Sequence, residues 1–513
     1  MTKTHNDVRN YRLSRREAFK KFATGIGSIA LSDVISASSL TPNPKSRNSG
    51  FSTGTCKINQ IVDTYVEKVR KRAHIPGLSI GVMREGQPIL LKGYGMANLE
   101  HGVPATEKTL YQLASITKQF TATGIMILFE EGKIKLEDKI HKHLSGLPTQ
   151  WSDVTIRHLL THTSGITSYT DDPKILEKLT LDITKDQVFD AVISYHDIRF
   201  APGERWEYCN SGYVLLGRII EEISGDDYGT FLKRRIFNPL KMLNTGVDDE
   251  KAILKGRSNG YVWESGTLTK AKVIDQTWAL AAGDLISNVL DLAKWDRALY
   301  GDDILPQHRL REMWTPVRLN DGSAFPYGFA WNIENVSGHF GLSHSGAAFG
   351  YGSVIFRFPD DKLSVVVLLN EQCWIDPNPV HPAYLGGVTI AGLYEPELAT
   401  RGKKAIKDQA PKITELAKVF LSKFMNSKPD EDLFSNEFWN RFSAWEFPYY
   451  VNFLQQAGLC QSITLVDRNK KGEDTTDLYQ LNFPSGTFML QLGINGNGKI
   501  SDMRLMGEVL EFS

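Results

Sequence analysis

The stretch YGSVIFRFPDDKLSVVVLLN, Tyr351–Asn370, contains a strong β-hairpin pattern. Two runs rich in Val, Ile, Leu and Phe flank the turn residues Pro-Asp-Asp. A second pair of β-rich runs, GLSIGVMREGQPILLKGYG at Gly77–Gly95, surrounds Arg-Glu-Gly-Gln-Pro. The chain between the two hairpins has mostly helical patterns. This order predicts an α+β fold, in which both ends of one domain form an antiparallel sheet flanked by helices, with a helical region inserted between its halves.

Five segments have apolar residues at the spacing of an α-helix. They are Ile58–Ile75, a run that begins at Ser115, a short segment at Thr155–Thr167, Ser211–Gly225 and Leu285–Gly301. We expect Ser287 to cap the last of these helices, because a serine hydroxyl can accept a hydrogen bond from a free N–H of the first turn.

Charge and cysteine content exclude some classes of protein. The 513 residues include 59 basic and 59 acidic side chains, so the formal net charge is zero. This balance argues against a nucleic-acid partner, which would favour a basic surface. Four cysteines lie far apart, at Cys56, Cys209, Cys373 and Cys460, and form neither a metal-binding pattern nor a disulfide framework. Free thiols are favoured, and a single long-range disulfide stays open.

The N-terminal segment, residues 1–40, has the order of an export signal: a basic start, an apolar middle and then small residues. Its SRREAFKK stretch resembles a twin-arginine signal. We therefore expect a periplasmic or cell-envelope protein, attached to the membrane only if this segment stays uncleaved. The alternative is a flexible basic arm on a cytoplasmic protein. Residues 41–56 are rich in Pro, Ser, Gly and Thr and predict a linker.

Domain boundaries follow from composition. Residues 57–400 should form the main domain, and the charged residues 401–412 a second linker. Residues 413–513 predict a small α+β module with one or two helices and three β-rich runs. The sequence INGNGK, Ile494–Lys499, predicts a hairpin turn within it.

The helical run at Ser115 starts with Ser-Ile-Thr-Lys, so Ser115 precedes Lys118 by three residues. A serine at a helix start is usually a cap. The same spacing also brings the lysine amine to the serine hydroxyl, because residues i and i+3 share a helix face. The flanking residues are apolar, and burial would lower the lysine pKa and let the amine accept a proton. A single such pair is expected by chance and decides nothing.

Two further motifs follow in order. Tyr208-Cys209-Asn210 precedes a predicted helix, and His344-Ser345-Gly346 precedes the hairpin at Tyr351–Asn370. The ordered triple S-x-x-K, Y-x-N and [HK]-[ST]-G resembles that of the serine β-lactamase and penicillin-binding-protein superfamily, in the branch of class C β-lactamases, esterases and D-aminopeptidases. The connecting segments RHLLTHTSGI, FAPGERWEYCNSGYVLLG, AAGDLISNVLDLAKW and YGFAWNI are similar to that family as well.

This resemblance implies a serine β-lactamase-like fold and specific roles for the motif residues. Ser115 would attack a carbonyl and form an acyl-enzyme, with Tyr208 as general base and its phenolate favoured by Lys118. Which of the two groups holds the proton stays open, because the two titrations are coupled. Asn210 would bind the substrate amide or orient Lys118. The N–H groups of Ser115 and Ala347 would form the oxyanion hole, and His344, Ser345 and Gly346 would belong to the strand that lines the substrate.

The implied function is a serine hydrolase for ester, amide or D-amino-acid peptide bonds, without a metal or organic cofactor. Its partner would be a small-molecule or peptide substrate, derived from the cell wall or unrelated to it. The alternatives are a true β-lactamase or D-Ala-D-Ala carboxypeptidase, and a non-catalytic binding protein that keeps the fold.

Two residues depart from the family pattern. His344 replaces the lysine of the related β-lactamases, and a mostly neutral histidine disfavours the carboxylate of a penicillin or cephalosporin. Asp284 replaces a glycine, with no consequence that the sequence reveals. His162 and Ser164 resemble a second Ser–His pair, but we assign them to a structural loop.

Overall fold

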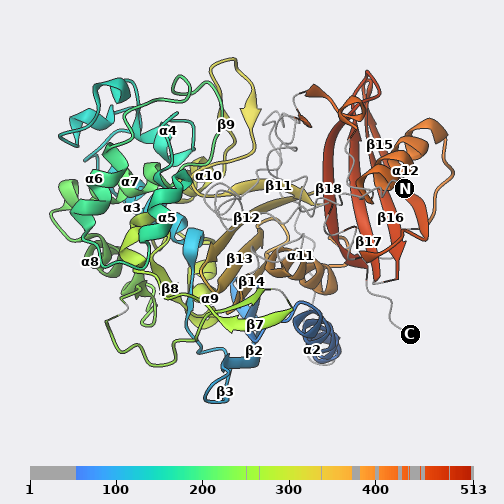
Figure 1. Ribbon diagram of the computed structural model, residues 1–513, viewed down its shortest axis with the longest axis horizontal. Helices are drawn as coiled ribbons and strands as arrows, with labels where there is room; N and C mark the ends of the chain where they lie inside the picture. Colours follow the sequence, from blue (N-terminus) through green and yellow to red (C-terminus); the bar gives the residue numbers. More distant parts are fainter. Residues whose placement is uncertain are drawn as a thin grey trace, which may run out of the picture.

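The computed structural model describes most of the chain from Gly54 onward (Figure 1). The described residues are 54–372 apart from 250, 265 and 337; 382–398; 404–425; 430–439 apart from 437; and 451, 454 and 457–509 apart from 485. The predicted signal segment lies outside these residues. Helix α2 (Gly54–Arg72) begins within the predicted linker 41–56.

A seven-stranded antiparallel sheet forms the centre of the main domain, in the order β11-β12-β13-β14-β1-β2-β3. Its strands are β1 (Gly77–Arg84), β2 (Gln87–Asn98), β3 (Val103–Pro104), β11 (Asn332–Val336), β12 (His339–Ala348), β13 (Tyr351–Phe358) and β14 (Leu363–Leu369). Strand β1 pairs with β14, so the two predicted hairpins join edge to edge. This confirms the predicted α+β architecture.

Both faces of the sheet are covered, so every residue of β13 and β14 is buried, and most of them are apolar. Ile355 and Val366 pair across these strands and pack into the core of the helical region. Their neighbours Val354 and Val367 also pair, and they pack on the opposite face, in a core shared with α2 and α11 (Pro382–Tyr394). A strand buried on both faces does not need polar residues in alternation.

The inserted helical region is organised around α3 (Thr117–Glu130) and α7 (Asn210–Ser224), which pack against each other. Every residue of α3 from Thr117 to Leu128 is buried. Helix α7 ends at Gly225, whose φ of +72° gives the left-handed stop that glycine favours. The other helices of this region are α4 (Ile156–Leu160), α5 (Pro173–Lys178), α6 (Lys185–Ile193), α8 (Tyr228–Leu232), α9 (Val289–Ala298) and α10 (Gln307–Met313).

The helix predicted at Leu285–Gly301 begins later than expected. Residues Leu285–Ser287 form strand β8, which pairs with β4 (Tyr111–Gln112) and β5 (Gly246–Val247). The side chain of Asn288, rather than Ser287, caps α9 by accepting a hydrogen bond from Asp291 N. A three-residue strand depends on its partners, and helical periodicity does not reveal them.

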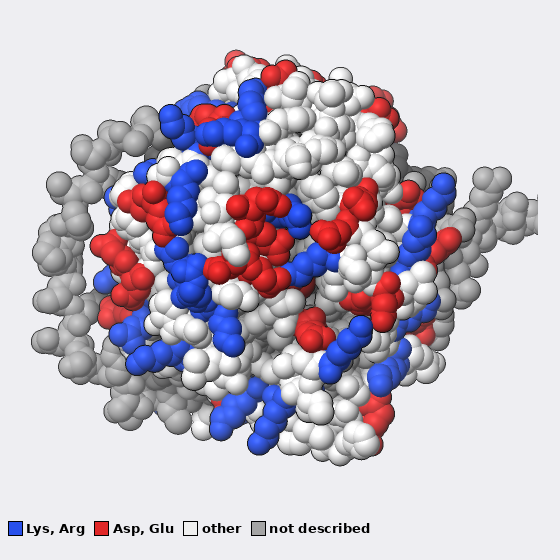
Figure 2. Space-filling model, turned by 90° about the vertical axis from the view of Figure 1, so that its left-hand side faces the viewer, with Lys and Arg blue, Asp and Glu red and all other residues white. Residues whose placement is uncertain are grey.

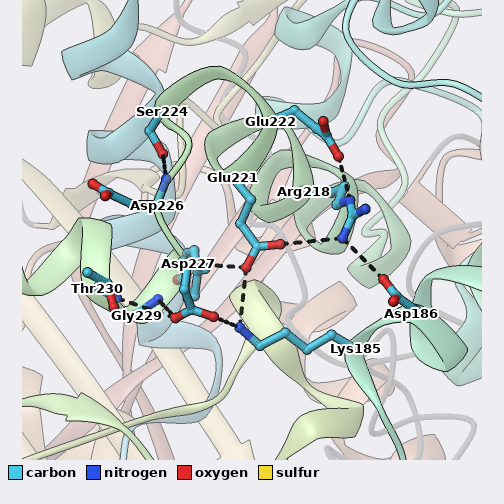
Figure 3. Close-up of polar contacts among 11 residues, drawn as sticks. Lys185, Asp186, Arg218, Glu221, Glu222, Ser224, Asp226, Asp227, Gly229 and Thr230 are labelled. Carbon is cyan, nitrogen blue, oxygen red and sulfur yellow. Dashed lines mark hydrogen bonds and ion pairs between the residues drawn. The ribbon is translucent and has the colours of Figure 1, made fainter.

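Charged side chains of both signs are interspersed on the face that carries α6 and α8 (Figure 2). One network of them joins three helices (Figure 3). Lys185 from α6 pairs with Glu221 from α7 at 3.2 Å and with Asp227, which caps α8. Arg218 pairs with Glu222 at 3.0 Å and with Asp186 at 3.2 Å. These partly exposed pairs link α6 with α7 and with the start of α8, and each contributes little to stability.

The C-terminal module contains α12 (Pro411–Met425) and a four-stranded antiparallel sheet. Its strands are β15 (Ser462–Lys471), β16 (Asp474–Phe483), β17 (Gly486–Ile494) and β18 (Ile500–Val509). The predicted middle run folds back at Pro484, so four strands replace the three expected. The predicted turn within Ile494–Lys499 joins β17 and β18. The second helix expected at residues 447–458 falls mostly outside the described residues. Cys209 and Cys460 are free thiols.

The module has its own core and a second apolar surface toward the main domain. Tyr479 and Leu490 are buried within the module, whereas Leu478 and Met489 belong to the core that α11 shares with the large sheet. Helix α11 contacts both β14 and β18, so it lies between the two sheets (Figure 1). Among the described residues, no helix has both the length and the apolar character needed to span a membrane.

We expect Met489→Asp to detach the module from the main domain. Met489 is 1% exposed, and burying an unpaired carboxylate there would cost several kcal/mol. Limited proteolysis should then release the module as a fragment that keeps its own core, because Leu490 is unchanged. The control is Gln491→Glu, at a partly exposed position of the same strand. If Met489→Asp resists proteolysis as well as the wild type, the contact of Met489 with the main domain does not hold the module.

Candidate active site

Ser115 lies in the short 3₁₀ helix Ala114–Ile116 that leads into α3. Ala114 has φ of +46°, a left-handed conformation that is costly for a non-glycine residue. Ser115 stays partly exposed, while the residues around it are buried. The structural interpretation of Ser115 as a helix cap is wrong. Helix α3 is preceded by Ile116 and has no side-chain cap hydrogen bond. The Ser115 hydroxyl therefore remains available for other contacts.

Lys118 is fully buried and touches three oxygen atoms from separate segments. Its Nζ lies 3.2 Å from Ser115 Oγ, 2.8 Å from Asn210 Oδ1 and 2.7 Å from the Ala282 carbonyl oxygen. Burial lowers the pKa of Lys118 well below its usual range. A neutral amine has two N–H donors and one lone pair. It can donate to the Asn210 and Ala282 oxygens while its lone pair faces the Ser115 hydroxyl.

Tyr208 donates a hydrogen bond of 2.8 Å from its hydroxyl to Ser115 Oγ. Its ring is buried, with Lys118 Nζ 4.9 Å from the ring centroid. Burial raises the pKa of Tyr208 above its usual range. The resemblance implied a Tyr208 phenolate favoured by a charged Lys118, but burial opposes the charged form of both groups. Burial thus favours a neutral phenol and a neutral amine, and a neutral amine can accept a proton.

Asn210 is the first residue of α7, and its amide is fixed on both sides. Its Oδ1 accepts from Lys118, and its Nδ2 donates to Thr170 Oγ1 at 3.0 Å. The Asn210 backbone N–H donates to Ser168 Oγ at 3.1 Å. Of the two roles expected for Asn210, these contacts favour orienting Lys118.

Strand β12 passes directly beside Ser115. A Cβ on Gly346 would lie 2.2 Å from Leu113 O and 3.1 Å from Ser115 N, so only glycine permits this approach. Strand β11 begins at Asn332, and Asn332 pairs with Ser343 of β12. Residues 344–348 of β12 therefore have no partner in the described part of β11. In an antiparallel sheet the backbone groups of alternate residues point to opposite edges.

That alternation determines which groups of β12 face the open edge. Strands β11 and β12 are joined by only two residues, so the flanking pair 336–339 should be hydrogen-bonded, and by alternation residues 341 and 343 should also direct their backbone groups to β11. The next residues of the same parity, Ser345 and Ala347, therefore direct their backbone groups to this edge beyond the end of β11. The side chains of both residues are partly exposed. The Ala347 N–H therefore faces the open edge, and its role with the Ser115 N–H in an oxyanion hole stays a prediction.

His344 lies on β12, as expected, and its part in substrate binding stays a prediction. The ring is fully buried. Its Nδ1–H donates to the Ser345 carbonyl oxygen at 2.7 Å, and its Nε2 lies 3.1 Å from Tyr327 OH. Burial and the nearby Lys118 lower the pKa of His344 to about 3. At neutral pH it offers the substrate no positive charge.

His162 and Ser164 do not form a Ser–His pair. Ser164 Oγ accepts from Ile166 N at 3.3 Å, and His162 Nδ1 accepts from Cys209 N at 3.1 Å. The His162 ring is nevertheless next to the site, 4.3 Å from the Tyr208 ring between centroids. Sequence reasoning left His162 out of the site, because the signal was only a histidine in a short loop 46 residues before Tyr208.

Asp284, which replaces a family glycine, is buried close to the turn that supports Lys118. It is 2% exposed and follows Ala282 by two residues. Among the described residues, its Oδ1 has no hydrogen-bond partner. Burial raises the pKa of Asp284 well above its usual range, so the carboxyl prefers its neutral form.

No cluster of three or more His, Cys, Asp or Glu side chains within the described ranges is arranged to hold a metal ion. The two histidines near Ser115 are each engaged by protein hydrogen bonds. The chemistry available in the site is that of a hydroxyl, an amine, a phenol and backbone N–H groups.

Known proteins match the region that contains this site. The family model described as Beta-lactamase matches residues 59–386. Penicillin-binding protein 4* of Bacillus subtilis is 35% identical over 310 residues, which are 56% of this chain and 67% of the relative. The chain spans about two thirds of the length of the curated relatives it matches.

Solved structures agree with the fold. A D-stereospecific amidohydrolase from Streptomyces sp. is 29% identical with a TM-score of 0.52, covering 63% of this chain and 96% of that one. The octameric penicillin-binding protein homologue from Pyrococcus abyssi is 24% identical with a TM-score of 0.57. It covers 88% of this chain and 98% of its own, so this likeness in fold extends beyond the main domain.

We expect Gly346→Ala to slow acylation of Ser115 by about 10²–10³-fold, the usual cost of losing one oxyanion-hole donor. The added Cβ would overlap Leu113 O and push β12 away from Ser115. Gly341→Ala on the same strand is the matched control, because its nearest contact would be an ordinary 3.5 Å. Acylation kinetics of the two folded variants check this. Equal rates would contradict the proposed role of β12.

We expect Asp284→Asn to stabilise the protein at high pH. The carboxyl has an ordinary pKa of about 4 when unfolded and a raised pKa when folded. Its contribution to stability is therefore full below about pH 4 and is lost as pH rises toward the folded pKa. Asp284→Asn should match the wild-type Tm near pH 4 and exceed it at pH 8. Thermal unfolding at both pH values tests this, with the exposed Asp197→Asn as control. A pH-independent difference would contradict it.

Proposed function

Because this chain belongs to the β-lactamase family, we propose that it forms an acyl-enzyme on Ser115 and hydrolyses ester, amide or D-amino-acid peptide bonds. The three motifs predicted membership of this family, and the match over residues 59–386 confirms it. The predicted class of enzyme, a serine hydrolase, is confirmed as well. One observation supports the mechanism above all: the Tyr208 hydroxyl and the Lys118 amine both contact Ser115 Oγ, at 2.8 and 3.2 Å.

Acylation begins with the neutral Lys118 amine. Ser115 Oγ attacks the substrate carbonyl carbon, and its proton passes to the Lys118 lone pair as the new C–O bond forms. The N–H groups of Ser115 and Ala347 stabilise the negative charge on the carbonyl oxygen. The leaving alcohol or amine takes a proton from the Tyr208 hydroxyl as its bond to carbon breaks, and Lys118 returns the proton to Tyr208.

Deacylation uses the same groups in reverse. A water molecule attacks the acyl carbon and gives its proton to the Lys118–Tyr208 pair. Ser115 Oγ leaves and recovers a proton, so the acid product is released and the site returns to its starting state. The scheme needs Lys118 neutral. The rate of acylation should therefore decrease when pH falls below the lowered pKa of Lys118.

The substrate class follows from His344. Its buried ring stays neutral and is engaged by the Ser345 carbonyl oxygen and Tyr327 OH, so it supplies no cation for a substrate carboxylate. This favours esters, amides and D-amino-acid amides over penicillins. The likeness to a D-stereospecific amidohydrolase supports the amide class.

A second candidate is a β-lactamase or D-Ala-D-Ala carboxypeptidase, favoured by the 35% identity to a protein named as penicillin-binding. A third, a binding protein that keeps the fold, is disfavoured by the intact contacts among Ser115, Lys118 and Tyr208. We also propose that the substrate is a small molecule or peptide, with cell-wall fragments as the first class to examine, and that residues 1–40 direct export.

The decisive test is intact-mass analysis after treatment with a serine-reactive fluorophosphonate. We expect one adduct on the wild type and none on Ser115→Ala. Absence of an adduct on the wild type, or an equal adduct on Ser115→Ala, would refute the proposal. Assays with a p-nitrophenyl ester, a D-amino-acid amide and a fluorescent penicillin then separate the substrate classes. Turnover of the first two with little labelling by penicillin is the expected result.

A further inference from the structure

The backbone on both sides of Tyr208 is held by one residue, His162. The N–H of Glu207 donates to the His162 carbonyl oxygen at 2.9 Å. The N–H of Cys209 donates to the imidazole Nδ1 of the same residue at 3.1 Å. Tyr208 is therefore fixed between two hydrogen bonds that end on a single histidine.

The His162 ring also supports Tyr208 from the side. It is 1% exposed and lies 4.3 Å from the Tyr208 ring between centroids, with Tyr327 at 5.0 Å and Tyr213 at 5.1 Å. These rings enclose the imidazole, so a shift of His162 would shift Tyr208 as well.

The backbone of His162 is strained. Its φ of +57° lies in the left-handed region, which is uncommon for non-glycine residues, although asparagine, aspartate and histidine adopt it more often than others. Strain of this kind persists where surrounding contacts demand it, and it is frequent at functional sites. Here the conformation lets both the carbonyl and the imidazole of one residue reach the segment 207–209.

The hydrogen bond from Cys209 determines the tautomer of His162. Because Nδ1 accepts, the ring proton must be on Nε2, and among the described residues Nε2 has no hydrogen-bond partner. Burial lowers the pKa of His162 well below its usual range, and the nearby Lys118 and His344 add to this effect. The imidazole therefore stays neutral and does not transfer a proton to Ser115.

Cys209 is also the residue that precedes α7, and Asn210 begins this helix. The hydrogen bond from Cys209 N to His162 thus fixes the backbone between Tyr208 and Asn210, whose side chains both extend into the site. Tyr208 OH extends to Ser115 Oγ, and Asn210 Oδ1 extends to Lys118 Nζ.

We propose that His162 is a positioning residue for acylation. Through the Cys209 N–H and the Tyr208 ring, it holds the Tyr208 hydroxyl on Ser115 and Asn210 on Lys118. This proposal rests on the proposed function, because it assumes that Ser115 is acylated. It assigns His162 no direct contact with substrate, so its loss should reduce the rate of the chemical step and leave substrate binding unchanged.

Two substitutions distinguish the effect of the hydrogen-bond acceptor Nδ1 from the effect of the volume of the His162 ring. His162→Asn keeps a short-range hydrogen-bond acceptor for Cys209 N and is a residue type that tolerates positive φ. His162→Leu fills part of the same space with an apolar side chain but removes the hydrogen-bond acceptor. Ser164→Ala is the matched control in the same loop, because the Ser164 hydroxyl bonds to Ile166 N rather than to the segment 207–209.

The measurements are the maximal rate at which the fluorophosphonate phosphonylates Ser115, the acylation rate, kcat and KM for a p-nitrophenyl ester, and Tm. We expect His162→Leu to lower the acylation rate and kcat by about 10–100-fold, the effect of misplacing a reacting group by a fraction of an ångström to about 1 Å, with KM unchanged. His162→Asn should recover most of this loss, and Ser164→Ala should resemble the wild type.

Three outcomes would overturn the proposal. The first is a folded His162→Leu that is acylated at the wild-type rate. The second is a His162→Asn that is as slow as His162→Leu. The third is failure of both variants to fold, which would make His162 a residue of the fold alone. Failure of the wild type to be acylated would instead refute the proposed function, so the two failures are distinguishable.

Discussion

The buried amine of Lys118 is the constraint on which the site depends. Its Nζ meets oxygen atoms of Ser115, Asn210 and Ala282, which come from the turn before α3, the start of α7 and the segment before β8. Burial lowers the pKa of Lys118 well below its usual range and so favours the neutral amine, which is a base. The same burial that stabilises the helical region therefore also favours a basic amine beside Ser115.

The large sheet completes the site by close contact of backbones. Strand β12 approaches Ser115 so closely that only glycine fits at position 346. The early end of β11 leaves Ser345 and Ala347 with backbone groups directed to an open edge. Ser115 belongs to the helical region and Ala347 to the sheet, so the site lies where the two parts meet. The C-terminal module contacts the main domain elsewhere, through α11.

Much of the fold could be predicted from sequence, because the elements concerned are long and periodic. The hairpins at Gly77–Gly95 and Tyr351–Asn370 and the helix at Ser211–Gly225 have patterns that depend only on neighbouring residues. The strand Leu285–Ser287 was predicted as helix, because it is defined by its pairing with Tyr111–Gln112, a segment far away in the sequence. Motif order likewise predicted which residues meet at Ser115.

The sequence by itself determined the family, the hairpin-bounded architecture and the identity of the groups that surround Ser115. Only the tertiary structure decided how these groups behave. Burial favours the neutral forms of Lys118 and Tyr208, and it makes His344 a neutral ring engaged by the Ser345 carbonyl oxygen. Folding also brings the loop histidine His162 against Tyr208. A residue type fixes which atoms are present, whereas protonation and orientation depend on desolvation and on contacts between distant segments.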